Sequence, residues 1–191
     1  MDNQPTDWDR IWGATRGGIF SRLRKSLTAA IARRFAGLDG LFLEAGCGES
    51  HLLHHITAKT VGIDFSRAAC KKSAQNGATV VRGNFHRLPF RPVFDTVFSQ
   101  GVLQAENDPV LAARSMMNAV KPGGTLTFTL PKKYSVFHVA GKLENIVPIW
   151  PRVHQQYWSR QDVLRLFFEW NPTVEDMWYR QLFFVTLKRG E

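Results

Sequence analysis

Short apolar runs alternate with stretches of helical character between Leu41 and Leu130, and this alternation restricts the fold more than any other feature. The apolar runs occupy residues 41–44, 60–64, 78–81, 95–99 and 124–130. Helices are predicted between them at residues 49–57, 66–75 and 108–120. Strands that are connected through helices pair in parallel, because each crossover returns the chain to the same end of the sheet. The pattern therefore predicts an α/β fold built on a mostly parallel sheet.

The residues on either side of this region predict further elements. We expect a helix over residues 159–170, and its apolar face is predicted to carry Val163, Leu164, Phe167 and Phe168. Strands at 173–179 and 181–188 follow and should form an antiparallel hairpin at one edge of the sheet. Upstream, apolar residues recur at near-helical spacing over 20–35, and Arg and Lys lie on the opposite face. Packing on the sheet is the commoner role of such a helix, although a basic amphipathic helix can also contact a membrane surface.

Composition bears on location and on metal binding. The opening residues are polar and acidic where a secretory signal needs a basic end and an apolar run, and no stretch is long enough to span a bilayer. The two cysteines, Cys47 and Cys70, show neither disulfide nor metal spacing. We therefore expect a cytoplasmic protein without a bound metal.

The stretch Glu44-Ala45-Gly46-Cys47-Gly48 places two glycines directly after an apolar strand. Gly46 allows a sharp turn, and Gly48 lets the backbone approach a ligand closely. Asp64 closes the next strand, 18 positions beyond Gly46, where a carboxylate can accept hydrogen bonds from a ribose. A nicotinamide-binding site is the alternative, but that fingerprint requires Gly or Ala where this chain has His51.

With these motifs the chain resembles the class I S-adenosylmethionine-dependent methyltransferases, most closely the type 11 relatives that modify small molecules. Five segments carry the resemblance, in the family's order: residues 44–50, 62–66, 83–90, 94–104 and 120–124. The resemblance covers most of the chain. It implies a Rossmann-like three-layer α/β sandwich with a seven-stranded, mostly parallel sheet and an antiparallel C-terminal hairpin strand.

The resemblance implies S-adenosylmethionine as the cofactor and S-adenosylhomocysteine as its product. The residues expected to bind the cofactor are Glu44, Gly46, Cys47, Gly48, Asp64, Phe65, Asn84, Phe85, Ser99 and Gln100. By this resemblance Asp64 holds both ribose hydroxyls, and the side-chain carbonyl of Asn84 contacts the adenine amino group in place of the usual Asp. Taken from the residues alone, Asp64 as a helix cap and Asn84 as a turn residue remain alternatives.

Relatives of this kind usually build the substrate pocket from the N-terminal segment and an insertion after the fifth strand. We expect one domain over 1–191, divided into an N-terminal helical lid (1–40), a cofactor-binding core (41–130), a substrate-lid insertion (131–158) and a C-terminal helix and hairpin (159–191). The insertion is rich in basic and aromatic residues, which predicts a lid over a planar or anionic acceptor. The residues expected to stack on the acceptor are Trp150, Tyr157 and Trp158. The residues expected to attract its carboxylate or phosphate are Lys132, Lys133, Lys142 and Arg152. The alternative is that the tryptophans fill the core and the charges are solvated.

Methyl transfer from a sulfonium needs a positioned donor and an in-line nucleophile, and a general base only if the acceptor must lose a proton. The candidate bases are His138, Tyr134 and His154, because they lie in the insertion, whereas His54 and His55 are expected at the surface. The family often has His where this chain has Gln104.

The expected function is therefore transfer of a methyl group to oxygen, nitrogen or carbon of a small, anionic or aromatic molecule. The net charge of +9 would suit a nucleic acid. However, enzymes that methylate nucleic-acid amino groups carry an Asn or Asp followed by Pro-Pro and an aromatic residue. This chain has Ser99-Gln100-Gly101-Val102 at that place, which disfavours a nucleic-acid partner without excluding it. Two alternatives remain: a non-catalytic protein that binds S-adenosylmethionine, and a membrane-associated enzyme for a lipid or quinone, suggested by the basic helix.

Overall fold

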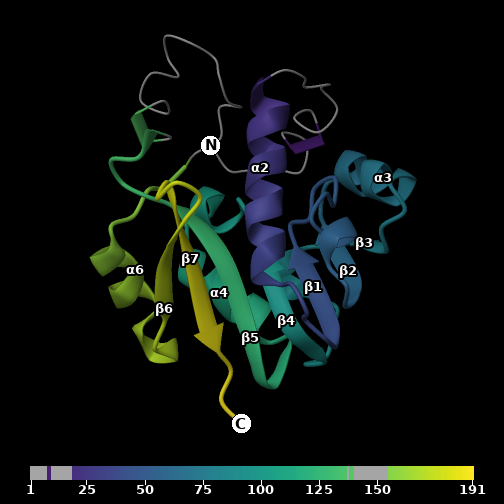
Figure 1. Cartoon of the computed structure of the whole chain (residues 1–191). Helices are drawn as coiled ribbons and strands as arrows, with labels where there is room; N and C mark the ends of the chain where they lie inside the picture. The colour runs from purple at the N-terminus through teal and green to yellow at the C-terminus, as the bar shows by residue number, and fades with distance from the viewer. Residues whose placement is uncertain (1–7, 10–18, 137, 140–154) are drawn as a thin grey trace.

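Seven strands form one sheet in the order β3-β2-β1-β4-β5-β7-β6 (Figure 1). The structure, a computed structural model, describes residues 8–9, 19–136, 138–139 and 155–191. The strands are β1 (Leu41–Ala45), β2 (Lys59–Asp64), β3 (Val80–Arg82), β4 (Phe94–Ser99), β5 (Val120–Pro131), β6 (Thr173–Met177) and β7 (Leu182–Lys188). Neighbouring strands from β3 to β5 are parallel, whereas β7 is antiparallel to both β5 and β6. The predicted mixed sheet with its antiparallel hairpin is confirmed.

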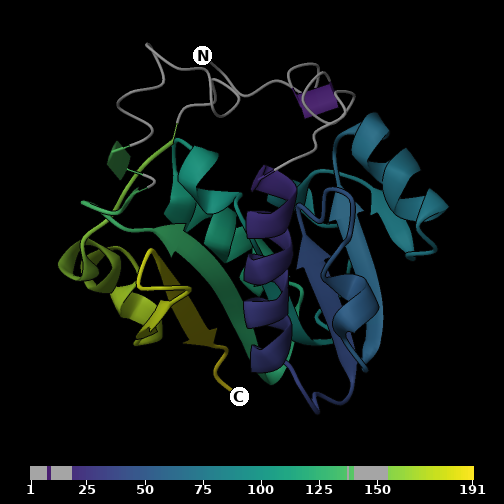
Figure 2. The ribbon, with the colours of Figure 1, turned by 45° about the horizontal axis from the view of Figure 1, so that its top comes forward.

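Helices cover both faces of the sheet (Figures 1 and 2). They are α2 (Ile19–Arg34), α3 (Arg67–Gln75), α4 (Pro109–Met117) and α6 (Arg160–Leu166), with single turns η1 (Leu53–His55), η2 (Phe85–Arg87), η3 (Leu103–Ala105) and η4 (Phe168–Trp170). One buried cluster joins α2 to the sheet, and a second joins α4 and α6 to the opposite face. The three-layer arrangement is therefore the one predicted.

Phe35 anchors the end of α2 to the centre of the sheet. Its ring lies 5.1 Å from the ring of Phe42 on β1, 5.2 Å from Phe98 on β4 and 6.0 Å from Phe184 on β7. Aromatic rings at these separations contribute both buried area and favourable edge contacts. Because the three partners come from three strands, this cluster fixes the C-terminal end of α2 against one face of the sheet.

The structure corrects the helix predicted at residues 49–57. Ser50 has a left-handed φ of 56°, which interrupts a helix after Glu49, and only the single turn η1 forms before β2 begins. His54 and His55 lie exposed on this turn, as expected.

The predicted helix over 159–170 is also shorter, because α6 ends at Leu166 and is followed by η4. Ser159 caps α6, with its hydroxyl accepting from the backbone N–H of Asp162 at 3.2 Å. Val163 and Phe167 are fully buried, whereas Leu164 and Phe168, which were expected on the same face, are exposed. Among the described residues, no helix is both long and apolar enough to cross a membrane.

Replacing Phe35 by alanine tests the anchor of α2. We expect Phe35→Ala to lower the free energy of unfolding by about 3 kcal/mol, because it leaves a cavity between three other phenylalanines. Phe168→Ala is the matched control, since that side chain is 77% exposed and its loss should change stability by less than about 0.5 kcal/mol. Urea unfolding monitored by circular dichroism measures both, and equal effects would contradict the proposed anchor.

Candidate functional site

The turn after β1 is tied to the end of β2. The backbone N–H groups of Gly46 and Cys47 both donate to the carbonyl of Ile63, at 2.8 and 3.1 Å. Gly46 has a φ of +73°, and a Cβ on it would lie 2.2 Å from Cγ2 of Val102 in the loop after β4. Gly46 therefore serves two purposes, a left-handed turn and close contact between two loops.

Asp64, the last residue of β2, connects this turn to the next helix. Its Oδ2 accepts from the N–H of Gly48 at 2.9 Å, and its Oδ1 accepts from the N–H of Ser66, the cap of α3, also at 2.9 Å. Burial raises the pKa of the Asp64 carboxyl, and the two backbone hydrogen bonds oppose that rise. Each carboxylate oxygen can accept more than one hydrogen bond, so Asp64 can still bind a hydroxyl.

Glu44 places a second carboxyl group on the neighbouring strand. Its side chain is buried, with 4% of its surface exposed, and Oε2 has no hydrogen-bond partner among the residues that the structure describes. Burial, and then the nearby charge of Asp64, raise the pKa of Glu44 to about 8. A buried carboxylate without a partner is costly, and a positively charged ligand group would relieve that cost. The pair Glu44 and Asp64 thus fits a cationic nucleoside better than an anionic one.

Comparison with known proteins agrees with this geometry. Residues 43–128 match the family model described as a methyltransferase domain, of type 11. These residues form a type 11 methyltransferase domain. No curated protein sequence matches the chain.

Solved structures share the fold of this chain at low sequence identity. The methyltransferase in complex with the Haloferax volcanii Trm112 methyltransferase activator is 13% identical, with 96% of this chain and 98% of that chain covered and a TM-score of 0.75. A S-adenosylmethionine-dependent methyltransferase of Thermotoga maritima is also 13% identical, with 97% and 100% covered and a TM-score of 0.75. Magnesium protoporphyrin IX methyltransferase of Synechocystis PCC 6803, with bound S-adenosylhomocysteine, is 16% identical, with 97% and 94% covered and a TM-score of 0.70. These likenesses identify the class I methyltransferase fold.

Several residues expected to bind the cofactor have structural contacts of their own. Ser99 is fully buried, and its hydroxyl donates to the carbonyl of Ala45 at 2.9 Å, which ties the end of β4 to the end of β1. The thiol of Cys47 is buried, and burial raises its pKa. Gln100 is half-buried at the beginning of the loop after β4. Ser99 and Cys47 therefore support the turn from beneath.

Asn84 and Phe85 follow β3 at the same edge of the sheet. The side-chain oxygen of Asn84 accepts from the N–H of His86 at 2.9 Å and caps η2, which is the turn role left open by the sequence. Phe85 is buried, and its carbonyl accepts from the hydroxyl of Ser115 on α4 at 2.7 Å. Asn84 is exposed, so its side chain is accessible to a ligand.

Two residues at this edge, Asp9 and Gln104, were not assigned a cofactor or acceptor role from the sequence. The Asp9 carboxylate accepts from the hydroxyl of Ser66 and from the N–H of Ala68 at 3.1 Å, and these bonds lower the pKa of Asp9. The ring of Trp8 lies 6.5 Å from that of Phe65, which is half-buried. Gln104 has a buried Oε1 to which no group in the described part of the chain donates a hydrogen bond. The sequence signal for Asp9 was its position next to Trp8, and the signal for Gln104 was that the family often has histidine at this position.

The insertion brings Tyr134, His138 and Tyr157 together. The N–H of Tyr134 donates to Nδ1 of His138 at 2.9 Å, and the rings of His138 and Tyr157 lie 4.7 Å apart. A neutral histidine that accepts at Nδ1 carries its proton on Nε2, so His138 faces its surroundings as a donor. Tyr134 is 88% exposed, and the third candidate base, His154, lies outside the described residues.

The expected cationic lid is corrected where the structure describes it. Lys132 pairs with Asp176 at 2.9 Å, and Lys133 pairs with Asp162 at 2.8 Å, which helps lower the pKa of Asp162 to about 2. Trp158 is 4% exposed and belongs to the core. Lys142, Trp150 and Arg152 lie outside the described part of the chain.

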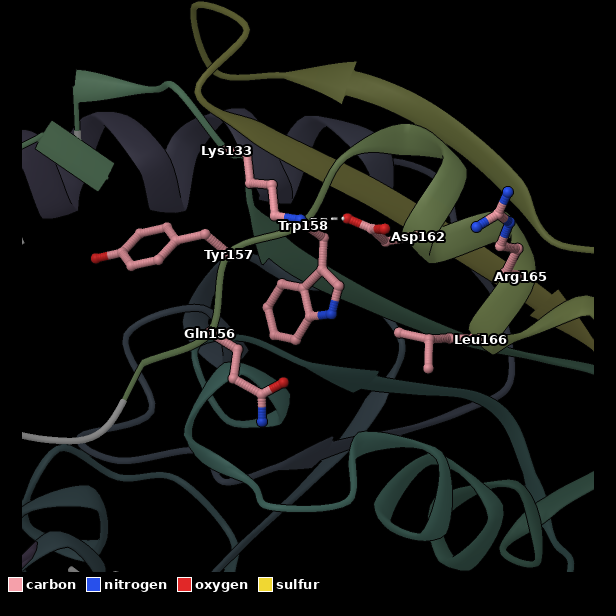
Figure 3. Close-up of a pocket in the computed structure, with 7 residues that line it drawn as sticks. All are labelled: Lys133, Gln156, Tyr157, Trp158, Asp162, Arg165 and Leu166. Carbon is pink, nitrogen blue, oxygen red and sulfur yellow. Dashed lines mark hydrogen bonds and ion pairs between the residues drawn. The ribbon is translucent and has the colours of Figure 1, made fainter.

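A surface pocket of about 380 Å³ lies beside these ion pairs (Figure 3). It is lined by Lys133, Gln156, Tyr157, Trp158, Asp162, Arg165 and Leu166. The ammonium group of Lys133 points toward the Asp162 carboxylate, so it is engaged by the protein itself. None of the residues expected to bind the cofactor lines this pocket.

Alanine substitutions at Gly46 and Gly37 distinguish the effect of a left-handed φ from the effect of close packing against Val102. Both have a φ of +73°, but a Cβ on Gly37 would meet nothing within 4 Å. We expect Gly37→Ala to cost about 1 kcal/mol through backbone strain alone, and Gly46→Ala to cost about 2 kcal/mol more through contact with Val102. Thermal unfolding of both variants measures the difference, and similar losses would show that close packing against Val102 is unimportant.

The pKa of Glu44 predicts a pH dependence of stability. Because the pKa rises from 4.5 to about 8 on folding, the folded state binds more protons, and the free energy of unfolding falls as pH rises between these values. Relative to Glu44→Gln, the native protein should lose roughly 3 kcal/mol between about pH 5 and about pH 8. Chemical unfolding of both proteins across this range tests it, and parallel curves would mean that Glu44 ionises normally.

Proposed function

We propose that the chain methylates a small molecule, using S-adenosylmethionine bound at the carboxyl ends of β1, β2 and β4. The observation that carries the proposal is the pair of buried carboxyl groups, Glu44 and Asp64, on adjacent strands, with one oxygen of Glu44 unpartnered. Glu44 would face the cationic amino-acid end of the cofactor, and Asp64 would accept from its ribose hydroxyls. Phe65 and Asn84 would contact the adenosine end.

The protein's part in the reaction is positioning. S-adenosylmethionine supplies an activated methyl group when it is bound. The turn held by Ile63 and Asp64 is fixed before binding, so the donor's orientation costs little further ordering of the backbone. Ser99 braces that turn from β4 and contributes no proton, because its hydroxyl is donated to the carbonyl of Ala45.

The state of His138 indicates which acceptors fit. With Nδ1 occupied by the N–H of Tyr134, the imidazole offers a proton at Nε2 and does not remove one from an acceptor. Acceptors that need no base, such as a carboxylate, a phenolate or a neutral amine, match this arrangement. The unpartnered Oε1 of Gln104 can accept from an N–H or O–H donor of such a molecule.

Replacing Asp64 tests the assignment of the ribose contact. We expect Asp64→Ala to weaken binding of S-adenosylhomocysteine by about 2 kcal/mol, because charged hydrogen bonds are lost. Glu169→Ala is the matched control, since that exposed carboxylate pairs with Arg114 in a part of the chain remote from the turn. Isothermal titration calorimetry measures both affinities, and unchanged affinity in Asp64→Ala would remove Asp64 from the ribose.

Catalysis is tested separately from cofactor binding. Purified protein with methyl-labelled S-adenosylmethionine should label members of a panel of carboxylates, phenols and amines. Tight binding of the cofactor with no labelled product would instead support the non-catalytic alternative. Absence of binding would overturn the proposal as a whole.

A further inference from the structure

Large apolar side chains are exposed together at the edge of the sheet that carries the cofactor turn. Tyr134, Val136 and Val139 follow β5 and are 88%, 71% and 55% exposed, and Tyr179, in the turn between β6 and β7, is 81% exposed. Both segments lie at the same end of the sheet (Figure 1). Exposed apolar groups that gather in this way mark an interaction surface.

Gln181 joins the two apolar segments into one surface. Its side-chain oxygen accepts from the N–H of Val136 at 2.7 Å, and its side-chain nitrogen donates to the carbonyl of Tyr179 at 3.1 Å. Its own carbonyl accepts from the N–H of Lys132 at 3.1 Å. These bonds fix the turn beside the segment after β5, so Tyr179 and Val136 are exposed as neighbours.

The turn itself has an unusual backbone. Trp178, Tyr179 and Arg180 have φ values of 46°, 54° and 62°, so three consecutive residues other than glycine are left-handed. Such conformations are unfavourable and are kept where the surrounding structure requires them, often at functional positions. Here the conformation holds a tyrosine outward at the edge of the domain.

Positive charge lies next to this apolar surface. The indole N–H of Trp178 donates to the hydroxyl of Ser26 at 3.2 Å, which places the turn against α2. Arg22 and Lys25 are exposed on α2 near this contact, and the helix sequence has five basic residues and no acidic one. Cationic side chains flanking exposed tyrosine and valine are the composition of a surface that lies at a lipid interface.

We propose that this surface, formed by Arg22, Lys25, Tyr134, Val136, Val139 and Tyr179 and called here the docking edge, binds anionic lipid bilayers. The apolar side chains enter the headgroup region, and the basic side chains attract the negative surface. The contact is peripheral and reversible, because the apolar groups are few. It directs the carboxyl edge of the sheet, with the Gly46 turn, toward the bilayer.

The aliphatic groups favour a bilayer over a nucleic acid. Arginine and lysine alone would suit phosphates of either, but nucleic acids are bound mainly through charged and polar contacts and base stacking. Val136 and Val139 offer neither charge nor a stacking surface. Their exposure beside the cations is accounted for by insertion among lipid headgroups and acyl chains.

Co-sedimentation with vesicles tests the proposal on the full chain without cofactor. We expect binding to phosphatidylcholine vesicles that contain about a third phosphatidylglycerol, and at least about tenfold weaker binding to phosphatidylcholine alone. The double variant Val136→Ser/Tyr179→Asn should bind the anionic vesicles about tenfold more weakly, since asparagine keeps the left-handed turn. Arg22→Gln/Lys25→Gln should bind about tenfold more weakly and lose most of the salt dependence.

Matched variants at the other end of the sheet are the controls. Phe168→Ser removes an equally exposed aromatic side chain, and Arg91→Gln removes an exposed cation before β4, and both should bind vesicles as the native protein does. Equal binding to neutral and anionic vesicles, or native binding by the two double variants, would overturn the proposal. So would binding of a single-stranded oligonucleotide that depends on the same residues while vesicles are not bound. Calorimetry with S-adenosylhomocysteine is independent of these results, so the proposed enzyme function can fail or succeed separately.

Discussion

The carboxyl group of Asp64 holds together the two loops on which the site is built. One oxygen receives the N–H of Gly48 and the other the N–H of Ser66, so the turn after β1 and the beginning of α3 share one anion. Since the carboxyl group is buried, its charged form depends on those two donors. The turn and the helix cap are thus parts of one hydrogen-bonded unit, and Glu44 lies on the neighbouring strand.

An aromatic cluster and one hydrogen bond fix the elements around this unit. Phe35 and its three aromatic partners set the position of α2, and the hydroxyl of Ser99 holds β4 level with β1. The proposed acceptor side is built differently, from the segment after β5 and from residues 155–158. The N–H of Trp158 donates to the carbonyl of Pro131 at 3.1 Å. One half of the site is therefore supported by the core, and the other by connections between surface segments.

The mostly parallel sheet and its antiparallel C-terminal hairpin could be predicted because buried strands have a recognisable composition. The run Leu41-Phe42-Leu43 is apolar on both faces of its strand, and the glycine turn follows this strand. The prediction of a helix at 49–57 was wrong because Ser50 adopts a left-handed conformation, which is not expected from the sequence at a serine. Phe168 was misplaced because the end of α6 depends on what Phe167 packs against.

The site was predictable where it follows a strand and unpredictable where it depends on contacts between distant segments. Glu44 and Asp64 are placed by the strands that carry them. In contrast, the bond between Asp9 and Ser66, 57 positions apart, and the occupied ring nitrogen of His138 depend on loop conformations. The pairing of Lys132 with Asp176, on a strand that follows much later, likewise removes a charge that composition alone assigned to a ligand.

The position of β7 also affects how the protein is made. This strand is the last of the seven in sequence, yet it lies between β5 and β6, where it pairs with residues 125–131 of β5 and with the whole of β6. During translation, β5 and β6 therefore leave the ribosome with unpaired backbone edges, and the face around Phe98 lacks its cover from Phe184. The sheet can close only when the final strand emerges, so the growing chain remains prone to aggregation until that point.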